Sequence, residues 1–513
     1  MTDDLKVTYR RSRPEDEAEL RALLHRTPLP GPIRLSMRKE PDFFAAMAVE
    51  GERTDVLVAE DVSDGRLVGV GARSEKPCFV NGADEPVTVG YLSNLRIEAP
   101  YRGGKILKAG YQQMERMHRE GSARVYTTTI LEGNIPAIKA LTSGRPGLPL
   151  YRDFGPFHSF MLSARALPVK ADGPFDTTDA TPDDIDELIR FWHTEGRRRQ
   201  FFPAYRAQHL AGDCAFSSPP SCGAATLAAA TPVQGAPLRS GSSTPAVSSS
   251  PPSCGAATLA AATPVQGAPL RSGSSTPAVS SSPPSCGAAT LAAAMPVQGA
   301  PLRSGSSTPA VSSSPPSCGA ATLAAATPVQ GAPLRSGSST AAVSSSPPSC
   351  GGLLSGLGVA DIAVARDCRG IAGTAALWDQ TAFRQWFVEG YSGGLALARP
   401  AYNLAARLLR RPALPAPGTS FAYRFLALLC IRDDRPEVLR ALLAHLGRRC
   451  RADRFTGLVV AGCATRDPLC AALASLPHVL MRSRLYVVHW DDGRDAFDAL
   501  DKALVPYLEV GGL

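Results

Sequence analysis

The chain has 513 residues with 54 basic and 46 acidic side chains, a net charge of +8, and this length favours two domains over one. Half of that excess comes from four arginines in a tract without acidic residues (Arg239, Arg271, Arg303 and Arg335), and the remainder is too small to indicate a nucleic-acid partner. The N-terminus has no apolar core of a signal peptide, and no apolar run is long enough to span a bilayer. We therefore expect a cytoplasmic protein with no nucleic-acid and no membrane partner.

The cysteines indicate neither disulfides nor a metal site. Five of the twelve recur at intervals of 32 residues within a repeat, and no two have the CxxC spacing that is typical of zinc ligands. We expect reduced cysteines and no metal.

The first 165 residues predict a regular succession of strands and helices. A strand-like run, KVTYRR, precedes a helix that begins at Pro14 and has acidic residues in its first turn. Two strands joined by a tight turn are expected within 55–72, and further strands at 124–130 and 157–162. Interspersed helical segments make this a mixed α/β pattern with a central sheet.

The run VTVGYLSNLRI, residues 87–97, predicts a longer strand. Its apolar residues alternate with period 2, which predicts one half-buried face that runs through the whole strand (Val87, Val89, Tyr91, Leu95 and Ile97). Downstream, apolar or small residues recur at spacings of three and four, which predicts a helix with a buried face (Leu107, Gly110, Met114 and Met117).

Between this strand and this helix stands the segment YRGGKIL, with Gly103 and Gly104 at the expected helix start. Unpaired amides at a helix N-terminus favour an anion, and glycine lets a ligand approach the backbone closely. The junction therefore predicts a binding site for a phosphate or pyrophosphate, to which Lys105 adds a positive charge.

A 32-residue unit recurs four times from about residue 219, and a fifth copy breaks off at Gly351. Alanine, proline, serine, threonine and glycine dominate the unit, so it offers too little apolar surface to offset the entropy of ordering. We expect residues 216–351 to be a disordered insert that the fold of the first copy does not need.

A second, fainter repeat relates the two ends of the chain. The segment RPEDEAELRALLH matches TPDDIDELIRFWH at an offset of 168 residues, and the two strands within 55–72 are echoed from Asp361. The sequence thus predicts one fold used twice, in residues 5–165 and in residues 172–513, with the insert interrupting the second copy.

With these elements in place, the first copy resembles the GNAT (GCN5-related) N-acetyltransferase superfamily. The resemblance rests on the order of elements, the long strand at 87–97, the arginine-glycine turn into a helix, and the segment TTTILEGNIPAIKAL. It implies a GNAT-like α/β fold that binds acyl-CoA, most simply acetyl-CoA, through the strand end, the helix start and an asparagine (Leu95, Arg96, Ile97, Arg102, Gly103, Gly104, Lys105, Ile106, Leu107 and Asn134).

The resemblance says less about catalysis, because two expected groups are missing. The strand has no carboxylate between Glu85 and Glu98, and Leu141 stands where many relatives have a tyrosine acid. Glu98 is then the candidate base, acting through water, and Tyr151 is the candidate acid. The structural alternatives, an exposed strand-end acid and a core tyrosine, remain open.

Two functions follow from the resemblance. The first is an N-acyltransferase that moves an acyl group, most simply acetyl, to a primary amine of a small molecule or peptide. The second is a non-catalytic protein that binds acyl-CoA as a regulatory ligand or serves as a scaffold. In either case the second copy is expected to have lost the cofactor site, because Asp433, Asp434 and Pro436 replace the glycines there.

Overall fold

The computed structural model describes residues 7–29, 31–170, 173–210, 352–409 and 411–513. The repeat-bearing segment 216–351, expected to be a disordered insert, lies outside the described residues. Its two described flanks meet, because a side chain built on Gly352 would lie 3.7 Å from Cδ2 of His209. Residues His209 and Gly352, on the two sides of that segment, therefore lie close together.

The first part of the chain forms the expected strands and helices, together with a strand, β2, that was not predicted between the first two helices and that pairs with β13 (Gln385–Tyr391). They are β1 (Val7–Arg11), α1 (Glu17–Arg26), β2 (Ile33–Arg38), α2 (Phe43–Met47), β3 (Arg53–Asp61), β4 (Leu67–Phe79), β5 (Val87–Ile97), α3 (Gly104–Arg119), β6 (Tyr126–Leu131), α4 (Ile135–Leu141) and β7 (Leu150–Ser163).

The second part continues with a similar alternation. Its elements are β8 (Asp176–Asp179), α5 (Ile185–Gly196), β9 (Arg199–Gln200), β10 (Phe202–Pro203), β11 (Ile362–Asp367), β12 (Gly370–Trp378), β13 (Gln385–Tyr391), α6 (Gly394–Leu408), β14 (Tyr423–Ile431), α7 (Pro436–Ala452), β15 (Leu458–Ala464), α8 (Cys470–Ala474), β16 (His478–His489), α9 (Arg494–Asp498) and β17 (Val505–Pro506).

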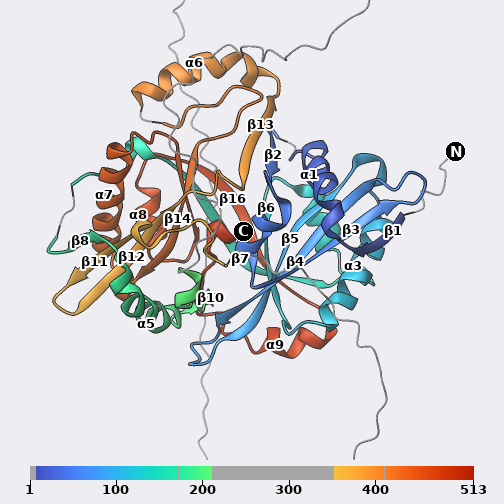
Figure 1. Ribbon diagram of the computed structural model, residues 1–513, viewed down its shortest axis with the longest axis horizontal. Helices are drawn as coiled ribbons and strands as arrows, with labels where there is room; N and C mark the ends of the chain where they lie inside the picture. Colours follow the sequence, from blue (N-terminus) through green and yellow to red (C-terminus); the bar gives the residue numbers. More distant parts are fainter. Residues whose placement is uncertain (1–6, 30, 171–172, 211–351, 410) are drawn as a thin grey trace, which may run out of the picture. The chain divides into compact units, whose positions relative to one another are not determined.

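Most of these strands form one large mixed sheet (Figure 1). Its order is β1-β3-β4-β5-β6-β16-β7-β15-β14-β12-β11-β8, with β10 beside β4. Most neighbours are antiparallel, whereas β5 with β6 and β14 with β15 run parallel. The mixed α/β fold with a central sheet that the sequence predicts is confirmed.

The two segments exchange their last strands at the centre of this sheet. Strand β16 lies between β6 and β7, and β7 pairs with β15 of the second segment. Strands β7 and β16 also pair with each other, from Leu162 opposite His478 to Leu150 opposite His489. Segments 5–165 and 172–513 therefore share one sheet, and each supplies a strand that the other needs.

The helix after β5 packs as its periodicity predicts. Met114 and Met117 of α3 are 5% and 1% exposed and belong to the same apolar cluster as Trp490, which comes from the other end of the chain. His118 stacks on Trp490 and binds Asp492 at 2.9 Å, so this histidine joins the two segments.

Helix α6 leaves several large apolar side chains exposed. Figure 1 shows it at the top of the view, beyond the end of β13. Leu397, Leu404 and Leu408 are 87%, 66% and 81% exposed, while Ala406 on the other face is buried. This helix therefore contributes little apolar burial to the core.

Candidate functional site

A bulge near the end of β5 shapes the site. The pairing with β4 shifts register between Val70 and Ala72, opposite Asn94, whose φ of 55° is left-handed. The extra residue reverses the alternation of side chains, so Arg96 continues the face of Ser93. The prediction of one continuous apolar face through Leu95 and Ile97 is therefore wrong beyond Ser93, and Leu95 is 38% exposed.

Strands β5 and β6 then separate. They form parallel pairs only at Gly90 with Tyr126 and at Tyr91 with Thr127. A side chain at position 90 would collide with the Tyr126 ring, so glycine is required where the strands are closest. The Thr128 hydroxyl donates to Leu92 O at 2.8 Å, and no further ladder pair joins β5 to β6 in the described chain. The edge of β5 beyond Leu92 is thus open.

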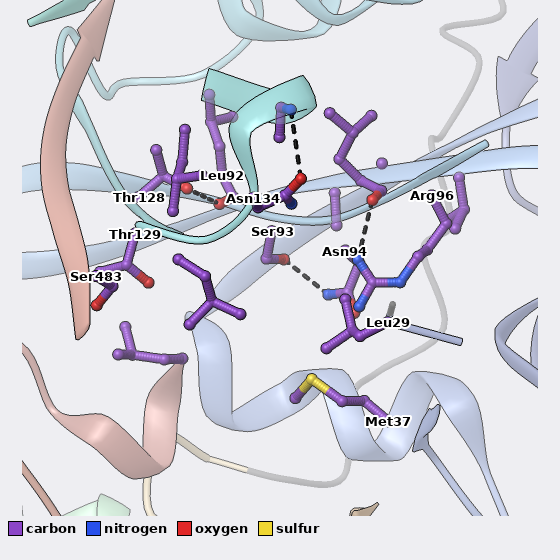
Figure 2. Close-up of a pocket in the computed structure, with 18 of the residues that line it drawn as sticks. Leu29, Met37, Leu92, Ser93, Asn94, Arg96, Thr128, Thr129, Asn134 and Ser483 are labelled. Carbon is purple, nitrogen blue, oxygen red and sulfur yellow. Dashed lines mark hydrogen bonds between the residues drawn. The ribbon is translucent and has the colours of Figure 1, made fainter. Parts of the chain in front are cut away.

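A cavity of about 510 Å³ occupies the space that this separation leaves. Figure 2 shows side chains of β5 (Ser93, Asn94 and Arg96) and of β6 (Thr128 and Thr129) around it. The second segment closes the other side, with apolar side chains that include Trp386, Phe421, Phe425, Val460 and Met481. A cavity of this size and apolar character is typical of a binding site for a small ligand.

Six of the ten residues that the resemblance assigns to the cofactor line this cavity (Leu95, Arg96, Ile97, Ile106, Leu107 and Asn134). Arg102, Gly103, Gly104 and Lys105 are not among the lining residues. Arg102 donates from Nε to Ile97 O at 3.0 Å and so ties the turn to the strand end.

The start of α3 lies beside the cavity, since Ile106 and Leu107 of its first turn line the cavity. The N-cap is Gly103, which has no side chain to accept from the first amides, and the first turn holds no acidic residue. The φ of Gly103 is 178°, which is ordinary extended backbone, and a side chain at this position would meet no atom within 4 Å. The first backbone amides of this 16-residue helix have no side-chain cap, and Lys105 makes the first turn basic, so the helix start favours binding of an anion.

Asn134 is the N-cap of α4. Its Oδ1 accepts from Ala137 N at 3.3 Å (Figure 2), and its Nδ2 has no hydrogen-bond partner among the described residues. The amide group is therefore oriented by the helix and still has donors for a ligand.

Tyr151 lines the cavity and shares a hydrogen bond of 2.5 Å with the Tyr111 hydroxyl. Burial, followed by the effect of Tyr111, raises the pKa of Tyr151 well above its usual value, and burial raises the pKa of Tyr111 to about 12. Both phenols are protonated at neutral pH, so Tyr151 can donate a proton but cannot act as a base. Sequence reasoning missed Tyr111, which becomes a candidate only through its contact with Tyr151.

Glu98, the candidate base, lies elsewhere. It accepts from Arg26 at 2.7 Å and from Arg66 at 2.8 Å, its side chain is 11% exposed, and it does not line the cavity. These two ion pairs make Glu98 a link between α1, the β3–β4 turn and the strand end.

A buried cluster of charged and polar groups lies at the bulge instead; we call it the Glu50 cluster (Lys39, Glu50, Ser93, Asn94 and Arg384). Glu50 accepts from Lys39 Nζ at 3.2 Å, Asn94 Nδ2 at 3.1 Å, Arg384 at 2.5 Å, and Ser93 Oγ. All five residues line the cavity. The sequence carried no signal for the cluster, because its members come from β5, from the segments after β2 and α2, and from the turn before β13 in the second segment.

Burial acts to raise the pKa of the Glu50 carboxyl, but the charges of Lys39 and Arg384 outweigh it and hold this pKa below its ordinary value. Burial, and then the charge of Arg384, lowers the pKa of Lys39 to about 7. Within the cluster, Lys39 is the group whose charge changes near neutral pH.

The strand–helix junction between β14 and α7 in the second segment carries two acidic residues. Asp434 pairs with Arg198 at 3.2 Å and with Arg199, and Asp433 lies 3.4 Å from Arg369. These ion pairs place two carboxylates beside the start of α7, where they disfavour an anion.

In the described ranges no three histidine, cysteine or acidic side chains gather as metal ligands would. None of the helices described there has the length and hydropathy needed to cross a bilayer.

A scan against protein-family models finds no match, and neither does a search of curated proteins. Solved structures with some similarity include a GCN5-related glucosamine N-acetyltransferase region of a fungal multi-domain GH3 β-N-acetylglucosaminidase (10% identity, 95% of this chain, TM-score 0.44). The chain spans 38% of that protein's length.

Two further similar structures are acyltransferases by name. One is Saccharomyces cerevisiae N-myristoyltransferase with bound myristoyl-CoA (7% identity, 94% of this chain and 82% of that one, TM-score 0.45). The other is a probable N-acyltransferase from Enterococcus faecalis (6% identity, 94% and 72%, TM-score 0.37). Scores this low add no argument about activity, which therefore rests on the site itself.

Proposed function

We propose that this protein is an acyl-CoA-dependent N-acyltransferase of GNAT-like fold, with its active site in the cavity between β5 and β6. The observation that carries the proposal is the junction of an open strand edge with an uncapped helix N-terminus at one apolar cavity. Such a site suits an elongated ligand that has amide groups at one end and an anion at the other.

Acyl-CoA has this chemistry. The amides of its pantetheine arm would pair with the open edge of β5 at Leu95–Ile97, as an added strand does. Its pyrophosphate would lie on the first amides of α3, from Gly104 onward. Asn134 would donate from Nδ2 to the pantetheine from the β6 side. Acetyl-CoA is the simplest donor, and the acceptor is a primary amine of a small molecule or peptide.

In the reaction the amine nitrogen attacks the thioester carbonyl, the C–N bond forms, the C–S bond breaks, and the thiolate leaves and must be protonated. Tyr151 is the candidate donor of that proton, because its hydroxyl lines the cavity and stays protonated. Tyr111 holds that hydroxyl in place through their shared hydrogen bond.

Calorimetric titration of the full chain with acetyl-CoA tests the binding step. We expect a dissociation constant well below 1 mM, and absence of binding at millimolar acetyl-CoA would contradict the proposal. Thiol release in the presence of a panel of amines tests turnover. Tyr151→Phe should lower kcat by about 100-fold without weakening acetyl-CoA binding, while Tyr111→Phe should have a smaller effect.

A second candidate is a non-catalytic protein that binds acyl-CoA as a regulatory ligand. The position of Glu98 favours it, because one of the two expected catalytic groups lies outside the cavity and is occupied by Arg26 and Arg66. Tight acetyl-CoA binding with no thiol release on any amine of the panel would support this candidate over the enzyme.

We also propose that the chain arose from two copies of one fold, the second of which lost the cofactor site. The sheet has the same arrangement from both edges, with β1-β3-β4-β5-β6 on one side and β8-β11-β12-β14-β15 on the other. Only the first copy has glycines at its strand–helix junction. Binding of one acetyl-CoA per chain is the expected stoichiometry.

A further inference from the structure

We propose that Lys39 is the proton acceptor of the active site: its neutral amine takes a proton from the ammonium group of the acceptor. This inference rests on the proposed N-acyltransferase function and deepens it. The sequence analysis assigned the role of base to Glu98.

The position of Lys39 fits the role. It follows β2, its side chain is only 5% exposed, and it lines the cavity. An ammonium group has three donors, yet Nζ has one hydrogen-bond partner in the described part of the chain, Glu50 Oε1 at 3.2 Å. The remaining positions on Nζ are thus available to a ligand in the cavity.

The charges around Lys39 favour its neutral form. Glu50 is the anion that binds Lys39, and it is already paired with Arg384 at 2.5 Å. The charges of Arg384 and Arg96 both act on Lys39 and favour loss of its proton. Both arginines keep their protons at any physiological pH. Protonated Lys39 would leave this buried group with excess positive charge, and burial of unbalanced charge is costly. Loss of one proton from Lys39 relieves that excess.

The other groups that line the cavity cannot take its place. Glu50 is occupied by four donors, and its pKa is depressed, so it is a weak and blocked base. Burial raises the pKa values of the lining tyrosines, which stay protonated (Tyr9, Tyr91, Tyr111, Tyr151 and Tyr423). No histidine is among the described lining residues. Lys39 is the remaining group that can bind a proton near neutral pH.

Lys39 is also close to the expected place of reaction. Its partner Glu50 binds Ser93 and Asn94, which directly precede the strand end that would hold the thioester (Leu95–Ile97). The acceptor ammonium gives one proton to Lys39, and the free amine then forms the C–N bond as the C–S bond breaks. Tyr151 gives its proton to the leaving thiolate, the second proton on the nitrogen passes to the Tyr151 phenolate and restores it, and Lys39 returns its proton to water.

A labelling experiment tests the ionisation of Lys39 without any substrate. The full chain is treated with a trace of acetic anhydride at pH values from 6 to 11, and the reactivity of each lysine is read by peptide mass spectrometry. We expect a midpoint near pH 7 for Lys39, far below the value of about 10.4 for a lysine in a model peptide. A midpoint near 10 for Lys39, or no reaction at any pH, would overturn the proposal.

Kinetics test the role itself, on whichever amine supports thiol release. Lys39→Arg keeps a positive charge but has a side chain that cannot lose its proton, and Lys39→Met removes the amine altogether. We expect both to lower kcat by at least about 100-fold, to change the dissociation constant of acetyl-CoA by less than threefold, and to abolish the acid limb of the pH–rate profile near pH 7. Lys502→Met should match the wild type in all three respects.

The outcomes separate this inference from the proposed function. If the wild type binds acetyl-CoA and turns over, but Lys39→Arg keeps its rate and its acid limb, then Lys39 is not the base and the acyltransferase assignment stands. If the wild type neither binds acetyl-CoA nor releases thiol, the proposed function fails and this role of Lys39 fails with it.

Discussion

Replacement of Gly103 by glutamate is the most direct test of the expected anion site. Position 103 caps α3, has ordinary extended backbone, and leaves open space where a side chain would begin. Glutamate at the start of a helix is itself favourable by about 0.3–1 kcal/mol. The Gly103→Glu chain should therefore fold normally, which separates an effect on binding from an effect on stability.

The size of the effect follows from the charges. A pyrophosphate on the first amides of α3 would carry about two negative charges at about 7 Å from the new carboxylate. With an effective dielectric constant of about 40–80, the repulsion amounts to about 1–2 kcal/mol. Since 1.4 kcal/mol is tenfold in affinity, Gly103→Glu should bind acetyl-CoA roughly 5- to 30-fold more weakly at low salt.

Titration calorimetry at low and at 1 M salt measures this effect. Because the Debye length falls to about 3 Å at 1 M salt, the difference from wild type should shrink to about threefold or less. Gly103→Gln, similar in size but uncharged, controls for steric hindrance. Pro436→Glu adds the same charge at the start of α7, where Asp433 and Asp434 already stand, and should change nothing. Equal affinity of Gly103→Glu and wild type at low salt would refute an anion site at α3.

Three other predictions concern stability. Deletion of 213–350 with a short Gly/Ser linker in its place should leave the acetyl-CoA affinity unchanged and Tm within about 4 °C, because His209 and Gly352 are in contact; loss of folding would contradict this. The folded-state pKa of Lys39, about 7, is below its ordinary 10.5, so the unfolded state binds more protons between these values and stability rises with pH there. Chemical denaturation should show that the free energy of unfolding rises by up to about 1.4 kcal/mol per pH unit in the wild type and that this rise is absent in Lys39→Met. Equal pH dependence of the unfolding free energy in the two proteins would contradict the pKa assigned to Lys39. Finally, Leu404→Lys on exposed α6 should change the unfolding free energy by less than about 0.5 kcal/mol. Leu442→Lys, at a buried position of α7, should lower the unfolding free energy by more than about 3 kcal/mol. Similar losses for the two variants would show that the exposed face of α6 is packed.

The local sequence pattern was sufficient to predict much of the fold. The strand at 87–97 and the helix that starts at Gly104 have the bounds that periodicity and the glycines indicated. The buried face of α3 at Met114 and Met117 and the paired strands from Asp361 were predictable in the same way. These features depend on contacts between residues close in the chain, which is the range that alternation, helical spacing and turn residues report.

Tertiary structure decided the site. The bulge at Asn94 comes from a left-handed backbone angle that alternation does not reveal, and it moves Arg96 to the face where Leu95 was expected. Glu98 is a chain neighbour of the strand end, yet ion pairs with Arg26 and Arg66 keep it out of the cavity.

The strand exchange and the Glu50 cluster could not be predicted from the sequence. Strand β16 completes the sheet beside β6, and Arg384 joins Lys39 on Glu50, although these partners are hundreds of residues apart in the chain. The amino-acid sequence by itself determined the elements and the anion-suited junction, because both arise from neighbouring residues. Which charges share a buried site, and so what their pKa values are, depends on long-range packing, and only the tertiary structure sets it.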